Sequence, residues 1–212
     1  MTKRIITAAL AVVMAASLMT GCVKVVKIGE EGNLTGETTF NAADSVDEAW
    51  EQAVSEITEN ATDLKDVLDK AGTDLKGLKE ECNGAKDDSA TNYNYPIKIE
   101  GAKITAVDKD GFYGTITLEV PDYTGSDTVT MEIGKYKSTA VSDGLSFVKF
   151  KDFKNQTEWS QFQKGFQSKV DSDVVQPVYD DLAEGATIDV IGCFTADSAD
   201  KVDIVPVSIT VK

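Results

Sequence analysis

The chain has 212 residues, with 21 lysines and arginines against 36 aspartates and glutamates and a formal net charge of −15. A surface this acidic repels phosphate backbones, which excludes nucleic acid as a partner. The sequence contains no histidine. That absence excludes a Ser-His-Asp triad and a histidine-bound zinc site, and we expect neither a metal nor another cofactor.

The N-terminus has the layout of a bacterial lipoprotein signal. A Lys-Arg pair at 3–4 precedes an uncharged apolar run over 5–19, and a Thr-Gly-Cys sequence then ends at Cys22. The run is shorter than the about 20 residues that a membrane-spanning helix needs, and small residues before a cut are typical of export signals. The pattern predicts removal of the signal peptide, residues 1–21, and lipidation of Cys22. An ordinary cleaved signal with a chance cysteine is the alternative.

Lipidation would determine where the mature chain resides. Two or more lipid chains anchor a protein stably, so we expect the mature chain outside the cytoplasm on a bacterial membrane, at the periplasmic face or the cell surface.

The mature chain divides into an anchored N-terminal segment, a helical segment and a β domain, predicted over 22–44, 45–82 and 95–212.

The helical segment carries a long apolar stripe. Ser45 and Glu48 have the spacing of a capping box, and apolar residues that include Trp50 follow at steps of three and four. This stripe predicts one long helix packed on its own domain, which Gly72 and Gly77 break or bend late. A coiled coil to a partner is the alternative. Removal of a buried Trp50 side chain would cost roughly 3–5 kcal/mol of stability.

The β domain alternates apolar and polar residues, as half-buried antiparallel strands do. Strands are predicted over 97–107, 115–120, 128–133, 187–195 and 202–211. Gly101 indicates a bulge, Pro206 indicates an edge strand or a bulge, and helical spacing from Trp159 predicts a helix that ends near Val178. Five strands with a helix between the third and fourth are the order of the OB-fold. We predict an α+β chain in which the long helix precedes an OB-like five-stranded antiparallel barrel; a generic α+β sandwich is the alternative.

Two further features carry chemistry of their own. Export permits a disulfide between Cys82 and Cys193, but the two residues have no motif spacing, and two inert thiols are the preferred interpretation. The aspartates at 197, 200 and 203 could hold a hard cation weakly. A solvated acidic loop is the preferred interpretation there.

The densest unusual stretch runs from Asp143 to Gln156, where phenylalanines alternate with polar residues before a helix. One interpretation is a ligand or partner site. Phe150 or Phe153 would form its apolar floor, and Asn155, Gln156 and Asp143 would supply polar groups. The other interpretation is that the aromatic side chains belong to the core and that an amide caps the helix.

Several stretches together resemble a family of predicted periplasmic lipoproteins that is described as a domain of unknown function. The stretches are Cys22 to Gly32, Thr39-Phe40 with Trp50, and Phe147 to Gln156. Ser142 stands where the family often has an arginine. The resemblance implies an accessory role in carbohydrate uptake, beside an ABC transporter or its solute-binding protein.

These observations favour a non-enzymatic accessory lipoprotein without catalytic residues. A small-molecule, sugar-like binding module is the first alternative. A cell-wall glycan hydrolase is the weaker alternative, because two carboxylates suffice for that reaction but no such pair stands out in the sequence.

Overall fold

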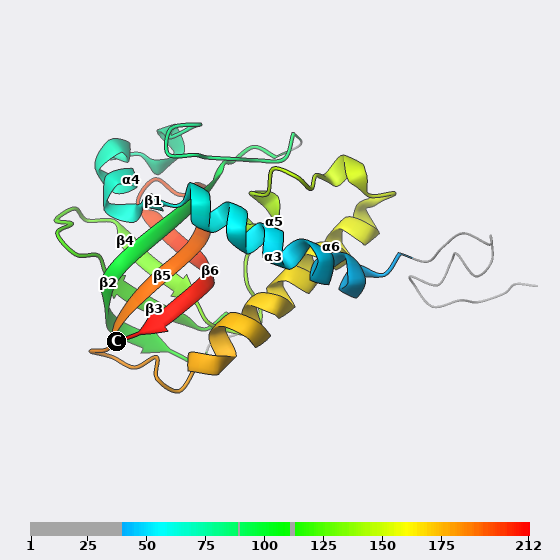
Figure 1. The fold of residues 1–212 in the computed structure, drawn as a ribbon. Coiled ribbons are helices and arrows are strands. Elements are labelled where there is room, and N and C mark those ends of the chain that lie inside the picture. The colour runs from blue at the N-terminus through cyan, green and yellow to red at the C-terminus, as the bar shows by residue number, and fades with distance from the viewer. Residues whose placement is uncertain (1–39, 89, 111–112) are drawn as a thin grey trace, which may run out of the picture. The chain divides into compact units, whose positions relative to one another are not determined.

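The structure is a computed structural model, and it describes residues 40–88, 90–110 and 113–212 (Figure 1). The predicted signal peptide and the lipidation site Cys22 lie outside the described residues. Residues 41–212 form one compact unit. Within the part that is described, no helix has the length and apolar character needed to cross a membrane.

Five strands close into a barrel. They are β2 (Asn94–Asp108), β3 (Thr115–Glu119), β4 (Thr128–Glu132), β5 (Thr187–Thr195) and β6 (Lys201–Val211). They pair in the order β2-β3-β4-β6-β5, and β5 pairs back to β2, so the barrel has no open edge (Figure 1). Closure removes the unpaired backbone groups that an open sheet would expose.

One pair of barrel strands corrects the prediction of an antiparallel barrel. β4 and β6 run parallel, with Val129 opposite Val202 and Met131 opposite Ile204, whereas the other barrel pairs are antiparallel. An odd number of strands cannot alternate direction all the way round a closed barrel. A five-stranded barrel therefore needs at least one parallel pair.

Bulges occur at the two positions that glycine and proline indicated. Gly101 has a φ of +77°, and the register between β2 and β5 shifts between Ile99 and Ala102. Gly192 lies opposite Pro206 where the register between β5 and β6 shifts. A proline has no N–H to donate to the ladder, so it is tolerated at this irregular position.

The barrel interior is filled by the alternating apolar residues of the strands. Each strand turns every second side chain inward, which accounts for the period of two in the sequence. Fully buried members of this core are Ile97, Ile104, Ile116, Met131, Ile188 and Ile204. Cys82 and Cys193 are both free thiols, and Cys193 is buried in β5.

The helix predicted over 45–82 breaks earlier than expected, after Asn60, and it ends again before Gly72, where a break was expected. Helix α3 spans Ala42–Asn60 and is capped by Asn41, not by Ser45. The two-residue strand β1 (Thr62–Asp63) then pairs in parallel with β2. Asp63 caps the next helix, α4 (Leu64–Ala71), which precedes the short 3₁₀ turn η1 (Leu75–Gly77).

The crossover from β4 to β5 carries the second set of helices. It contains α5 (Ala140–Asp143), the 3₁₀ turn η2 (Phe150–Asp152), α6 (Gln156–Lys169), the π-helical η3 (Val170–Val175) and the 3₁₀ turn η4 (Gln176–Val178). In Figure 1, α3 and α6 cross beside the barrel. Gly165 permits this close approach, because a Cβ there would lie 2.5 Å from Cγ2 of Val46.

The helix that contains Trp50 packs on its own domain, as predicted. The Trp50 ring lies 5.7 Å from that of Phe166 in α6, and α3 also contacts β2 and β5. Trp50 itself is only half-buried, whereas Val46, Ala53 and Ile57 on the same helix are buried. The stripe read from the sequence is therefore the packing face of α3.

Candidate functional site

An aromatic cluster joins the 147–156 segment to helix α6. The ring of Phe153 lies 5.1 Å from that of Trp159 and 5.1 Å from that of Phe162. Phe150 meets Trp159 edge-on at 6.5 Å, and Phe162 continues the contact to Phe166 at 4.9 Å. Phe150 and Phe153 thus form part of the support of α6, and both stay half-buried at the surface.

Asn155 is the N-cap of α6. Its Oδ1 accepts hydrogen bonds from the backbone N–H groups of Thr157 at 2.9 Å and Glu158 at 3.0 Å. These donors would otherwise have no partner within the helix. Gln156 is the first residue of the helix and is exposed.

Asp143 forms its side-chain hydrogen bonds with residues other than Asn155 and Gln156. Its carboxylate accepts from Thr139 Oγ1 at 2.6 Å and from Gln163 Nε2 at 2.7 Å. Burial raises the pKa of this carboxyl above its ordinary value, and the two hydrogen bonds oppose that rise. Gln163 lies seven residues beyond Gln156, or about 10 Å along a helix. The structure therefore brings Phe150 and Phe153 together but does not join Asp143 to Asn155 and Gln156.

The backbone of the same segment is tied to the loop that precedes β2. The N–H of Phe150 donates to Asp87 Oδ2 at 2.8 Å, and Nζ of Lys149 donates to the carbonyl of Lys86 at 3.0 Å. Oδ2 of Asp152 accepts from the N–H of Lys149 at 2.8 Å. These bonds hold the segment in place without a regular strand or long helix.

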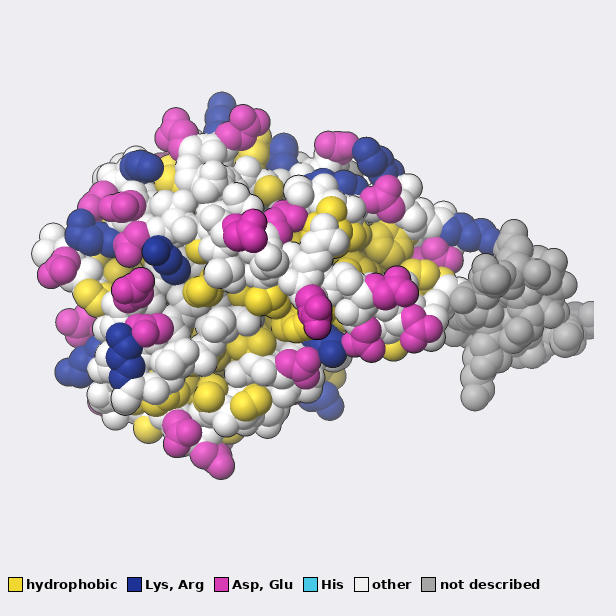
Figure 2. All heavy atoms as spheres, viewed as in Figure 1, with side chains coloured by type: hydrophobic (Ala, Val, Ile, Leu, Met, Phe, Trp, Pro, Cys, Tyr) yellow, Lys and Arg dark blue, Asp and Glu magenta, His cyan; other side chains and the backbone are white. Residues whose placement is uncertain are grey.

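Residues 147–156 form what we call the aromatic-basic surface. Phe147, Phe150 and Phe153 are half-buried, while Lys151 and Lys154 are exposed beside them. Figure 2 shows apolar side chains gathered over α3 and the start of α6. Three of the chain's 21 basic residues, Lys149, Lys151 and Lys154, lie within six consecutive positions of this segment. The whole chain has a net charge of −15, so this stretch is more basic than the rest of the sequence.

The described residues contain no group of three or more Cys, Asp or Glu side chains arranged to hold a metal ion. The aspartates at 197, 200 and 203 are among these described residues. Ser198 and Asp200 bond to one another in that turn, at 3.1 Å from Oγ to Oδ1. Asp197 and Asp200 are exposed in this turn, and Asp203 is half-buried in β6.

Comparison with solved structures places the barrel in the OB-fold class. An OB-fold protein from Thermotoga maritima matches with a TM-score of 0.65 and 16% sequence identity, over 82% of this chain and 100% of that chain. At this identity the likeness concerns the fold alone.

The chain belongs to the family described as "predicted periplasmic lipoprotein", domain of unknown function 2291, whose model matches residues 12–210. No curated protein matches the chain. The family supports an extracytoplasmic, lipid-anchored location.

The cap predicts a clear result for the two amides. Asn155→Ala together with Gln156→Ala should lower the free energy of unfolding by about 0.5–2 kcal/mol, the usual effect of losing an N-cap. The single change Gln156→Ala should have almost no effect, because Gln156 is exposed. Chemical denaturation of the three chains measures the difference. If the double variant is as stable as the parent, the cap contributes nothing and a binding role for the amides gains support.

Proposed function

We propose that this chain is a non-enzymatic lipoprotein that works beside a carbohydrate ABC transporter, and that it contacts the transporter or its solute-binding protein through the aromatic-basic surface. The lipid on Cys22 would keep it at the membrane where such a transporter operates. Residues 147–156 would then serve as the contact, and the closed barrel as its rigid support.

The observation that carries this proposal is the composition of the surface. Half-buried aromatic rings and exposed lysines lie next to one another, at Phe150 and Phe153 and at Lys151 and Lys154. Aromatic residues are enriched at protein interfaces. The lysines let an otherwise acidic domain approach an acidic partner without repulsion at the contact.

A second candidate, a binding module for small molecules, is supported by a separate pocket that contains one carboxylate, Glu56. A glycan hydrolase needs two carboxylates that face one another across the substrate. Among the described residues that line this pocket, Glu56 is the only carboxylate, so the pocket itself does not support a hydrolase.

The proposal is tested by capture from membranes. The lipidated chain, cross-linked in the cells that make it, should carry a transporter component or solute-binding protein on purification. Lys151→Glu with Lys154→Glu should reduce the captured amount several-fold. Lys76→Glu with Lys79→Glu is the matched control, because it makes the same charge change at exposed positions elsewhere. Equal capture by both variants, or capture of no transport component, would contradict the proposal.

The anchor needs its own measurement. Cys22→Ser should abolish incorporation of labelled palmitate and should release the chain from the membrane fraction, because the thiol that carries the lipid is gone. If the serine variant resists a carbonate wash as the parent does, Cys22 is not the anchor.

A further inference from the structure

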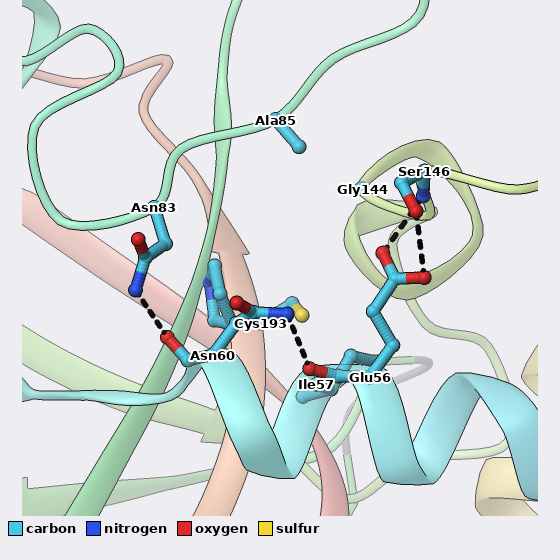
Figure 3. A pocket seen from close by; sticks show the side chains of 9 residues that line it. Glu56, Ile57, Asn60, Asn83, Ala85, Gly144, Ser146 and Cys193 are labelled. Atoms are coloured by element: carbon cyan, nitrogen blue, oxygen red, sulfur yellow. Dashed lines mark hydrogen bonds between the residues drawn. The ribbon is translucent and has the colours of Figure 1, made fainter.

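A pocket of about 260 Å³ lies beside the C-terminal part of α3, outside the aromatic-basic surface (Figure 3). Its apolar lining comes from Ile57 of α3, Ala85 of the loop before β2, Pro96 of β2 and Cys193 of β5. Ile57 and Cys193 are also buried in the core. The volume is below the ~300 Å³ at which sites for drug-sized ligands begin, so it suits a smaller solute.

The carboxylate of Glu56 is held at one side of the pocket. It accepts hydrogen bonds from Ser146 through the backbone N–H at 2.8 Å and Oγ at 2.9 Å (Figure 3). Two hydrogen bonds from one residue fix the orientation of the carboxylate. A carboxylate has about four lone-pair sites, so it can still accept from a ligand.

Two asparagines also line the pocket, and backbone carbonyl groups orient their amides. Nδ2 of Asn60 donates to the carbonyl of Glu56 at 2.8 Å, and Nδ2 of Asn83 donates to the carbonyl of Asn60 at 2.9 Å. A carbonyl accepts only from the nitrogen of an amide, so these bonds determine which way each amide faces. The Oδ1 of Asn60 is thereby left as an acceptor, whereas the amide of Asn83 points away from Glu56 (Figure 3).

The pocket is negatively charged as well as rich in acceptors. None of the described residues that line it is a lysine or an arginine. Burial raises the pKa of the Cys193 thiol, and the negative charge of Glu56 raises it further.

We propose that this pocket binds a small aliphatic amine in its ammonium form. The ammonium would donate to Glu56, which gives a charge-assisted hydrogen bond, and to Oδ1 of Asn60. The carbon chain would lie on Ile57 and Pro96. An anion is excluded by the carboxylate, and a neutral alcohol lacks the charge that the carboxylate favours. This site is independent of the partner contact proposed above, which lies on other residues.

The experiment compares three four-carbon probes that share a hydroxyl at one end. Aminobutanol, butanediol and hydroxybutyrate carry an ammonium, a hydroxyl or a carboxylate at the other end. Titrated into the isotope-labelled domain, aminobutanol should shift the NMR signals of Asn60, Asn83 and Ser146 and should bind at least fivefold more tightly than butanediol. Hydroxybutyrate should leave these signals unchanged. Equal binding of the three probes, or shifts away from the pocket, would overturn the proposal.

Two variants separate the pocket from the general acidity of the domain. Glu56→Gln keeps groups that can bond to Ser146 but removes the charge, and it should reduce the affinity for aminobutanol to that for butanediol. Glu59→Gln makes the same charge change on the exposed side of α3 and should leave the affinity unchanged. If both variants weaken binding equally, the amine binds the acidic surface and not the pocket.

A third variant covers the case in which Glu56→Gln perturbs the fold. Ala85 points its side chain toward the pocket (Figure 3), so Ala85→Leu should fill the space without changing any charge. It should abolish the aminobutanol shifts at Asn60 and Asn83. Binding that survives this change would place the amine elsewhere and would overturn the proposal.

Discussion

Phe162→Ala should lower the free energy of unfolding by about 3–5 kcal/mol, the loss typical of a buried aromatic residue in a core. Phe162 is only 2% exposed. Its ring lies between those of Phe153 at 5.1 Å, Trp159 at 5.8 Å and Phe166 at 4.9 Å. Removing it leaves a cavity within this cluster of aromatic rings. Urea denaturation followed by circular dichroism gives the value.

Two further variants, on α6 and α3, test whether the loss of stability comes from the burial of the Phe162 ring. Lys164→Ala removes an exposed side chain of α6 and should change stability by less than about 0.5 kcal/mol. Trp50→Ala should cost less than Phe162→Ala, because Trp50 stays half-buried against Phe166. If Phe162→Ala costs no more than Lys164→Ala, α6 does not contribute to the core in solution.

The barrel strands could be predicted from the sequence because each of them turns one face to the core. The alternation of apolar and polar residues records that arrangement directly, and β5 spans the residues predicted for it, 187–195. The bulge at Gly101 was predicted because a glycine inside a strand has no side chain to pack. The direction of β6 against β4 depends on barrel closure, which no local pattern expresses.

The break between α3 and α4 was missed because the apolar stripe continues across it. Ile57 before the break and Leu64 and Leu68 after it all face the core. The spacing of three and four residues is therefore preserved. The break is decided by pairing of Thr62 with Ile97, a contact between residues far apart in the chain. Asp63 was the local signal, because aspartate favours the N-cap that it forms.

Some of the candidate site residues could be found from local composition, whereas others are brought together only by the fold. The stretch from Asp143 to Gln156 was noticed because its composition is unusual locally. The structure makes Asn155 the N-cap of α6, and a capping amide was one of the two interpretations of the sequence. Glu56, Asn83 and Ser146 of the amine pocket come from separate segments of the chain. Each of them is an ordinary polar residue in its own surroundings. Their approach depends on the packing of α3 against the barrel, which a single sequence does not specify.

Lys137→Met should lower the free energy of unfolding at neutral pH by about 2–3 kcal/mol. The Lys137 side chain is 0% exposed and pairs with Oδ1 of Asp171 at 3.3 Å, and its Nζ also donates to the carbonyl of Gly134. Removing one partner of a fully buried ion pair costs about 3–5 kcal/mol. The expected loss is smaller here because the Asp171 side chain is 24% exposed and can be hydrated once the lysine is gone.

The loss should also depend on pH, through Glu132. Burial raises the pKa of Glu132 above its ordinary 4.5, a hydrogen bond from Ser138 opposes the rise, and the charge of Lys137 also lowers it. The folded chain therefore holds this proton more tightly than the unfolded chain, so the contribution of Glu132 to stability increases as the pH falls toward 4.5. Once Glu132 is neutral, its attraction to Lys137 is lost in the parent as well, and the two chains become more alike.

Urea denaturation of both chains across this pH range measures the effect, with Glu132→Gln as the control. Glutamine keeps an oxygen for the N–H of Ser138, whose bond to Glu132 is 2.6 Å, but carries no charge. In the Glu132→Gln background, Lys137→Met should therefore cost less at neutral pH, and its cost should no longer shrink as the pH falls. If the cost of Lys137→Met is the same at every pH in both backgrounds, the lysine stabilises the fold through Asp171 and Gly134 alone.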